Sequence, residues 1–163
     1  MIRKIVLWPD PVLATICAPV ERIDEDIRQL AADMLETMYA APGRGLAAPQ
    51  IGVALRLFVM DTTWKDGDRS PKIVINPEIV TESAVRTTGP EGCLSIPGVT
   101  ADVDRAETVT MRWTTPDGET REEGLTGFEA ICAQHEFDHL NGLVTFDRIA
   151  AEVRAELEKV YAG

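Results

Sequence analysis

The segment His135-Glu136-Phe137-Asp138-His139 has the form H-E-x-x-H, a pattern that binds a metal ion when it is helical. At about 100° per residue, four helical steps place the second histidine one turn beyond the first and within about 40° of it. Two imidazoles so placed can share one ion, and the glutamate between them can reach a water beside that ion. The chain has only 2 histidines, both in this segment. Their coincidence favours a metal site over two ordinary surface histidines.

A catalytic metal of this kind has three protein ligands and one open position. Cys132 lies on the same helical face, but seven residues separate it from His139, about 10.5 Å of helical rise, which is too far for one ion. Cys93 is a better candidate because Gly92 lets the backbone bend tightly beside it. From spacing alone, a carboxylate ligand, as in ordinary zinc proteases, remains an alternative.

The elements that must position these residues follow from the apolar spacing. A first helix is predicted over 25–40, with Asp24 as its N-cap. The second helix carries the histidines; it is expected to begin at Thr126, with Glu129 completing a capping box, and to stop at Asn141-Gly142. A last amphipathic helix is predicted over about 150–161.

The strands are predicted from short runs of β-branched and apolar residues bounded by turn residues. The predicted strands cover residues 2–7, 55–61, 72–76 and 107–114. Asp117-Gly118 indicates a hairpin turn, whereas the glycines and prolines of 85–105 indicate a loop and irregular edge. The expected fold is α+β: a compact single domain over 1–163, with short antiparallel strands packed around a central metal-binding helix.

Composition restricts the partners and the compartment. The net charge of −11 disfavours nucleic-acid binding. No apolar run approaches the roughly 20 residues of a membrane span, and the N-terminal apolar run is too short for a signal peptide. The odd number of cysteines (Cys17, Cys93 and Cys132) fits a reducing compartment. We expect a cytoplasmic protein with no membrane association.

Three segments, in this order, resemble the signature segments of the peptide deformylases. They are Gly43-Arg44-Gly45-Leu46-Ala47-Ala48-Pro49-Gln50, Glu91-Gly92-Cys93-Leu94-Ser95 and Gln134-His135-Glu136-Phe137-Asp138-His139. The opening Pro9-Asp10-Pro11-Val12-Leu13 extends the resemblance, so it covers most of the chain. Three segments at suitable spacing are far more specific than any one of them.

The resemblance implies removal of the formyl group from N-formylmethionine at the start of nascent peptides. It implies Cys93, His135 and His139 as ligands of one divalent ion, usually Fe²⁺, with Zn²⁺ or Ni²⁺ able to substitute. Glu136 would transfer the proton. The Gln50 side chain and the Leu94 backbone N–H would face the substrate carbonyl oxygen.

Further roles follow for the cleft. The resemblance implies that Gly45 lines the cleft beside the catalytic residues. The predicted substrate-binding residues are Gly43, Arg44, Phe128, Ile131 and Cys132. Arg44 departs from the aliphatic residue usual in the family and would add a positive charge at the entrance. The arginine that often follows the cysteine segment is absent from 98–102, which affects binding beyond the first peptide residue.

Supporting contacts are also predicted: Glu91 pairs with Arg105 to hold the Cys93 loop, and Asp138 or Gln134 orients an imidazole. Basic C-terminal helices in the family can dock on ribosomal RNA. Here Glu152, Arg154, Glu156, Glu158 and Lys159 sum to −1. We therefore expect ribosome association to be weak.

Three other functions compete with this interpretation. One is an H-E-x-x-H metallopeptidase with a carboxylate third ligand. Another is a divergent deformylase relative that acts on a different formylated substrate, an alternative that Arg44 keeps open. The third is a metal-binding scaffold without activity; Glu136 argues against it, because binding alone does not need that carboxylate.

Overall fold

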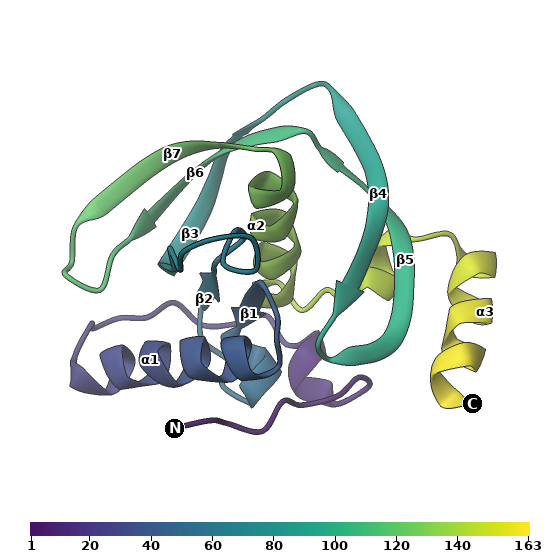
Figure 1. Ribbon diagram of the computed structural model, residues 1–163, viewed down its shortest axis with the longest axis horizontal. Helices are drawn as coiled ribbons and strands as arrows, with labels where there is room; N and C mark the ends of the chain where they lie inside the picture. Colours follow the sequence, from purple (N-terminus) through teal and green to yellow (C-terminus); the bar gives the residue numbers. More distant parts are fainter.

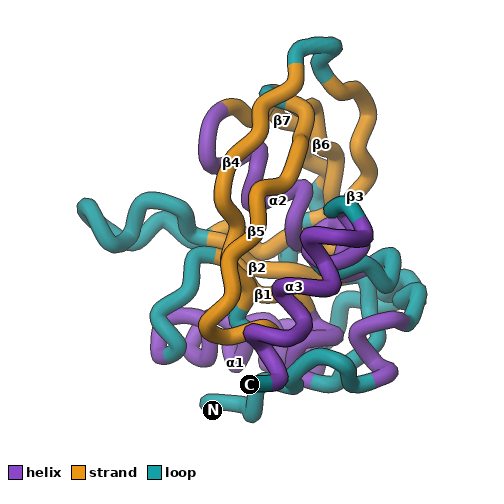
Figure 2. Tube along the Cα trace, turned by 90° about the vertical axis from the view of Figure 1, so that its right-hand side faces the viewer, coloured by secondary structure: helices purple, strands orange, loops and turns teal.

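Two antiparallel sheets surround a central helix in the computed structural model, which describes residues 1–163 (Figure 1). One sheet has the strand order β1-β2-β3-β6-β7, and the other pairs β4 with β5 (Figure 2). The strands are β1 (Gly45–Ala47), β2 (Leu57–Met60), β3 (Lys72–Glu82), β4 (Arg86–Cys93), β5 (Ile96–Ala106), β6 (Thr108–Thr114) and β7 (Thr120–Thr126). The helices are α1 (Glu25–Ala40), α2 (Gly127–Leu140) and α3 (Ala151–Ala162), with 3-10 turns at Pro11–Ala14, Ala48–Ile51 and Thr145–Arg148. The α+β fold predicted from the sequence is confirmed.

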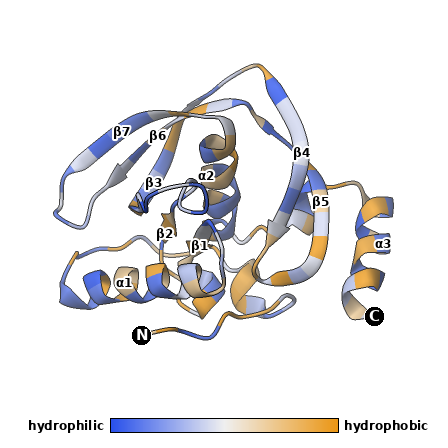
Figure 3. Ribbon diagram, in the orientation of Figure 1, coloured by the Kyte–Doolittle hydropathy of each residue, from blue (hydrophilic) through white to orange (hydrophobic).

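Strand β2 is buried on both faces because a helix covers each of them. Leu57 and Val59 pack in the cluster that contains the apolar face of α1. Phe58 and Met60 point the other way, into the cluster shared with α2. Four consecutive apolar residues are therefore buried in one strand, which Figure 3 shows as a hydrophobic segment at the centre of the molecule. This three-layer packing fixes α2 against the sheet.

Helix α1 forms where its spacing and cap predict. The Asp24 carboxylate accepts a hydrogen bond from the Ile27 N–H at 3.0 Å, which satisfies one free donor at the helix start. Met34 and Met38 are fully buried, and the opposite face carries charged residues (Figure 3).

Helix α2 begins after Thr126, as predicted, but the capping box is wrong. The Thr126 side chain makes no cap hydrogen bond. Glu129 instead forms an ion pair with Lys72 of β3 at 2.9 Å, because the helix start lies beside that strand. The end is as predicted: Asn141 is the C-cap, and Gly142 has φ +76°. None of the three α-helices combines the length and apolar character that a bilayer-spanning helix needs.

The predicted strand at 2–7 is wrong. The segment is irregular and donates the Val6 N–H to the Gln50 carbonyl and the Arg3 N–H to the Thr37 hydroxyl. Its contacts are with a 3-10 turn and a helix, neither of which offers a strand edge for a ladder. Apolar composition alone therefore could not make it a strand.

The predicted loop at 85–105 is also wrong, because most of it forms the long hairpin of β4 and β5 (Figure 2). Pro90 is tolerated because β4 has a partner on one side only, so its missing N–H leaves no ladder bond unmade. From Val99 to Arg105, every second residue of β5 is buried. That alternation is a strand signal which the glycines and prolines obscured. The other strands and the Asp117-Gly118 turn fall close to their predicted places, with β3 extending further along the chain.

Two glycines with positive φ allow a matched test of packing at the end of α2. A Cβ on Gly142 would lie 2.8 Å from the Ala14 backbone, whereas a Cβ on Gly118 would meet nothing within 4 Å. We expect Gly118→Ala to lower the free energy of unfolding by about 1 kcal/mol through backbone strain. Gly142→Ala should lower it by about 3 kcal/mol, because the same strain is joined by a clash. Urea unfolding of the two variants measures the difference; equal losses would contradict the close approach of Ala14.

Candidate metal centre

Three donor side chains from two elements meet at one point. Cys93 ends β4, and His135 and His139 lie on successive turns of α2, with one ligand atom of each residue within 4.8 Å of the others. The Cys93 Sγ is 3.5 Å from the His139 Nε2. Burial, and then the charges of His135 and Arg105, lower the pKa of His139 well below its ordinary value. The ring is thus in the neutral form that binds metals.

A buried ion-pair network connects the cysteine strand to the histidine helix. Glu91 accepts two hydrogen bonds from Arg105 at 2.8 and 2.9 Å and pairs with the His135 Nδ1 at 2.9 Å. The Arg105 guanidinium also donates to Asp138 at 2.6 Å. Burial alone would raise the pKa of Glu91, but Arg105, and then His135, lower it to about 2. The carboxylate is therefore charged and directs the His135 Nε2 towards the site.

The predicted pairing of Glu91 with Arg105 is present in the structure, but the predicted imidazole partners are wrong. Asp138 accepts hydrogen bonds from Arg105 and Arg148. Gln134 bonds the backbone of Ala106 through both its oxygen and its nitrogen. Both side chains point away from the imidazoles because α2 packs these faces against β5 and the segment that follows α2. The His135 imidazole is oriented instead by Glu91, which lies 44 residues earlier in the chain.

Glu136 is a buried carboxylate with an unused oxygen. Its Oε2 lies 4.0 Å from the His135 Nε2, while its Oε1 is buried without a hydrogen-bond partner. Burial raises the pKa of Glu136 to about 7, although the charge of His135 opposes the shift. A Cβ on Gly45 would lie 2.6 Å from the Glu136 Oε2. The glycine therefore leaves room for this carboxylate at the wall of β1.

Two hydrogen-bond donors face the same region. Gln50 accepts from the Ala47 N–H at 3.0 Å and directs its Nε2 towards the Cys93 Sγ at 3.5 Å and the Ser95 Oγ at 3.1 Å. The backbone N–H of Leu94, in the turn between β4 and β5, donates to no acceptor in the protein. The Gln50 amide is thus held rigidly, and the Leu94 N–H has no acceptor.

A cleft of about 500 Å³ brings nearly all the predicted residues together. Its walls include the predicted residues Gly43, Arg44, Gly45, Gln50, Leu94, Phe128, Ile131 and Cys132, together with Cys93, His135 and Glu136. His139 lies beneath the cleft and is 1% exposed. Burial raises the pKa of the Cys132 thiol well above its ordinary value, so it is a neutral wall residue and not a thiolate ligand.

Several contributors were missed in the sequence. Ser95 accepts the Gln50 amide, Arg148 binds Asp138 through two nitrogens, and Lys65 lines the cleft from the loop between β2 and β3. Trp64, on the same loop, donates its indole N–H to the Gly43 carbonyl at 2.9 Å. A tryptophan in a polar, glycine-containing loop was the one available signal for this contact.

The fold and the site define a class of protein. Two imidazoles and a thiol that converge beside a buried carboxylate, on a helix of the H-E-x-x-H type, are typical of metal-dependent hydrolases. The set contains a cysteine where metallopeptidases of this type have a carboxylate, so the peptidase alternative is not favoured.

The chain belongs to the polypeptide deformylase family, whose model matches residues 2–155. It is 48% identical to a peptide deformylase of Rhizobium meliloti over 91% of this chain and 86% of the relative. It is 47% identical to one of Alkalilimnicola ehrlichii, over 98% and 90%. A peptide deformylase structure from Legionella pneumophila superposes with a TM-score of 0.93 at 42% identity, covering 99% of this chain and 94% of that one. One from Synechococcus elongatus, in complex with actinonin, has a TM-score of 0.93 at 38% identity, covering 98% and 88%.

The activity follows from this membership. The chain is a metal-dependent hydrolase that removes the formyl group from formylated nascent peptides. The activity predicted from the sequence is confirmed.

Replacing Glu91 tests whether the buried network supports the metal centre. Glu91→Gln should weaken Ni²⁺ or Zn²⁺ affinity by about 10- to 100-fold, because the His135 ring loses its anionic partner. It should also lower the free energy of unfolding by about 3 kcal/mol, because Arg105 loses one of its two carboxylates. Chelator competition and urea unfolding measure the two effects.

The matched control is Asp104→Asn, whose carboxylate forms an exposed ion pair with Arg86 at 3.0 Å. Its effect on stability should stay below about 1 kcal/mol. Metal affinity that is the same in wild type and in Glu91→Gln would show that the network does not support the site.

Proposed function

We propose that Cys93, His135 and His139 bind one divalent cation and that Glu136 transfers the proton in formyl hydrolysis, within a single catalytic domain over 1–163. The observation that carries the proposal is the convergence of three donor atoms within 4.8 Å, beside a carboxylate with a buried, unpartnered oxygen. A binding site alone would gain nothing from burying such a carboxylate, which is unfavourable without a partner.

The donor set suits a first-row transition metal. Thiolate and imidazole are ligands of iron, zinc and nickel, whereas magnesium and calcium prefer oxygen. We propose ferrous iron as the physiological ion, as the family resemblance implies, with Zn²⁺ or Ni²⁺ as substitutes. When bound, the cation supplies Lewis acidity that activates water and polarises the formyl carbonyl.

The protein's own groups complete the reaction. Glu136 takes the proton of the attacking water and returns it to the amine nitrogen as the C–N bond breaks. The Gln50 Nε2 and the Leu94 N–H donate to the carbonyl oxygen as it becomes negative, and each such donor is worth about 3 kcal/mol. In support, the Leu94 N–H has no other acceptor, and Gln50 is fixed through its oxygen by Ala47.

The cleft fits an extended peptide. Strand β1 is the first strand of its sheet, and β4 has only β5 as a partner, so each presents one unpaired edge. Residues of both elements, including Gly45 and Gly92, line the cleft. A formylated peptide can lie between them as an added strand, with its methionine side chain against Phe128, Ile131 and Cys132.

The assay for this proposal is formate release from formyl-Met-Ala-Ser by anaerobically purified protein loaded with Fe²⁺ or Ni²⁺. We expect Glu136→Ala to lower turnover to background while the metal content stays at one ion per chain, because the proton carrier is removed but the ligands are kept. Cys93→Ala should lose the ion.

The control is Glu129→Ala, which removes a carboxylate of the same helix that is paired with Lys72 outside the cleft; it should retain activity. Cleavage of internal peptide bonds would favour the metallopeptidase alternative. Formate release only from another formylated compound would favour the divergent relative.

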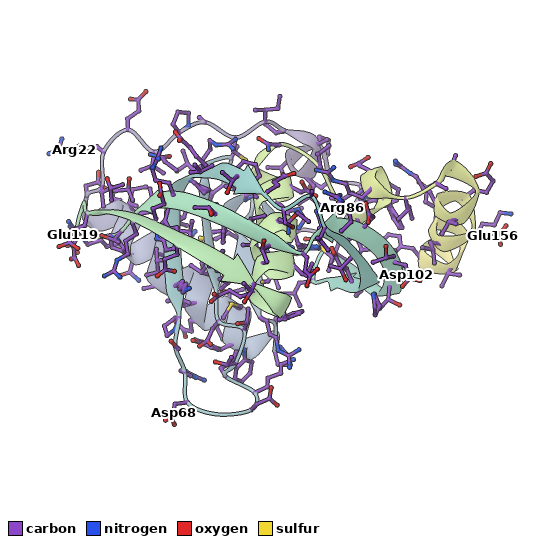
Figure 4. All side chains as sticks on the ribbon, turned by 90° about the horizontal axis from the view of Figure 1, so that it is seen from above. Arg22, Asp68, Arg86, Asp102, Glu119 and Glu156 are labelled. Carbon is purple, nitrogen blue, oxygen red and sulfur yellow. The ribbon has the colours of Figure 1, made fainter.

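We also propose that the protein acts in the cytoplasm, where nascent chains are made. Its association with ribosomes is expected to be weak. In α3, Arg154 pairs with Asp147 and Glu158, and Lys159 pairs with Glu156. Figure 4 shows Glu156 at the outer end of the molecule, on this helix. No unpaired cation of α3 is therefore available to bind RNA phosphates.

Cosedimentation measures this property. At 50 mM salt, the protein should remain mostly in the supernatant when ribosomes are pelleted. Affinity for RNA depends on the number of phosphate contacts, each of which releases about one counterion, and α3 offers few such contacts. Salt-sensitive pelleting with ribosomes would overturn the proposal.

A further inference from the structure

Arg44 is a cation at the substrate cleft that has no anionic partner in the protein. Its Nε is buried without a hydrogen-bond acceptor, and its guanidinium lies over the Phe128 ring, 5.4 Å from the centroid. Arg105, Arg112 and Arg148 each bind at least one carboxylate. Other arginines, such as Arg22 and Arg121, also lack an ion pair, but Arg44 alone has a guanidinium nitrogen that is buried without an acceptor, and it lines the cleft. A buried, unsatisfied cationic donor beside a substrate cleft points to an anion that arrives from outside.

A second cation reaches the same region. Lys65 lines the cleft from the loop between β2 and β3, which projects from the molecule with Asp68 at its tip (Figure 4). The Trp64 indole ties this loop to the Gly43 carbonyl, and the Tyr39 ring packs against Trp64 at 5.1 Å. Lys65 forms no ion pair either, and its Nζ lies 5.8 Å from the Trp64 ring centroid. The loop is therefore anchored beside the residue that precedes Arg44.

The two acidic residues of the cleft do not neutralise these cations. Glu91 is bound by Arg105 and His135. Glu136 lies at the Gly45 end, next to His135. The outer part of the cleft thus carries positive charge, while its inner part holds the metal ligands and the reacting groups.

The position of Arg44, directly before β1, decides which part of a substrate it meets. A Cβ on Gly45 would lie 2.6 Å from the Glu136 Oε2, so in the proposed function the formyl group lies near residue 45. Arg44 precedes Gly45 along the wall, at about one residue's spacing of 3.4 Å. Its long side chain can reach the one or two peptide residues that follow formylmethionine.

We propose that Arg44, assisted by Lys65, forms a carboxylate-binding subsite that selects formylated peptides with Asp or Glu at the first or second position after formylmethionine. This inference rests on the proposed function of the cleft. The guanidinium offers several donors in a planar fork that matches a carboxylate, and its stacking on Phe128 holds the fork in place.

Four formylated peptides test the subsite in the nickel-loaded protein by their kcat/KM values. The acidic ones are formyl-Met-Asp-Ser and formyl-Met-Ala-Asp, and their basic counterparts are formyl-Met-Lys-Ser and formyl-Met-Ala-Lys. The acidic member should exceed the basic one by about tenfold at one position or both, since attraction and repulsion each contribute up to about fivefold. The ratio should fall in 0.5 M NaCl, because salt screens partly exposed charges.

Substitutions separate the charge of Arg44 from its packing. Arg44→Met keeps an apolar chain against Phe128 and should bring the acidic-to-basic ratio close to 1; Arg44→Glu should invert it. Arg112→Met, a half-exposed arginine on β6 paired with Glu122, is the matched control and should keep the wild-type ratio. If Arg44 only walls the methionine pocket, its substitution will change the choice between formyl-Met and formyl-Leu and leave the acidic-to-basic ratio unchanged, which would overturn the proposal.

A binding measurement keeps this test independent of catalysis. The deformylated tripeptides Met-Asp-Ser and Met-Lys-Ser are titrated into the wild-type protein by calorimetry. Tighter binding of Met-Asp-Ser supports the subsite even if no formate is released from any formylated peptide, a result that would refute only the proposed function. Equal affinities, together with equal kcat/KM values for the acidic and basic substrates, would refute the subsite.

Discussion

The buried bridge from Glu91 through Arg105 to Asp138 is the interaction on which the candidate metal centre depends. Glu91 comes from β4, Arg105 from β5 and Asp138 from α2, so one guanidinium joins the separate hairpin to the helix. Three charges buried together are unfavourable unless each finds its partners, and here each does. Because the same Glu91 also pairs with the His135 Nδ1, the bridge that positions Cys93 also orients one of the histidines.

The second constraint is the rigidity of α2. The helix is buried along most of its length, with small residues such as Ala130 and Ala133 against the sheet and the histidines on the side of the cleft. Apolar contacts with β2 prevent its sliding, and the Asn141-Gly142 end is held close to Ala14. A helix fixed in this way holds the two histidines and the Glu136 carboxylate in one geometry, which is what catalysis by positioning needs.

The substrate cleft results from leaving strand edges unpaired. In most sheets exposed edges are protected, because an open edge invites unwanted pairing. Here the edges of β1 and β4 face one cleft. Gly43 and Gly45 in its wall have no side chains, and this leaves room for Leu94 and Glu136. In the proposed function these edges bind the peptide backbone, and the proposed charge of the outer cleft adds selection among peptides.

The sequence by itself determined the ends of α1 and α2, the α+β class and the placing of both histidines on one helix face. These depend on local spacing: apolar positions every three to four residues, a cap at Asp24 and two histidines one turn apart. Only the tertiary structure decided that 2–7 is not a strand and that 86–106 is a hairpin, since pairing depends on which edges come to lie alongside. The same reason explains the partners of the imidazoles: Glu91 and His135 are 44 residues apart, and no local pattern records a contact formed by packing.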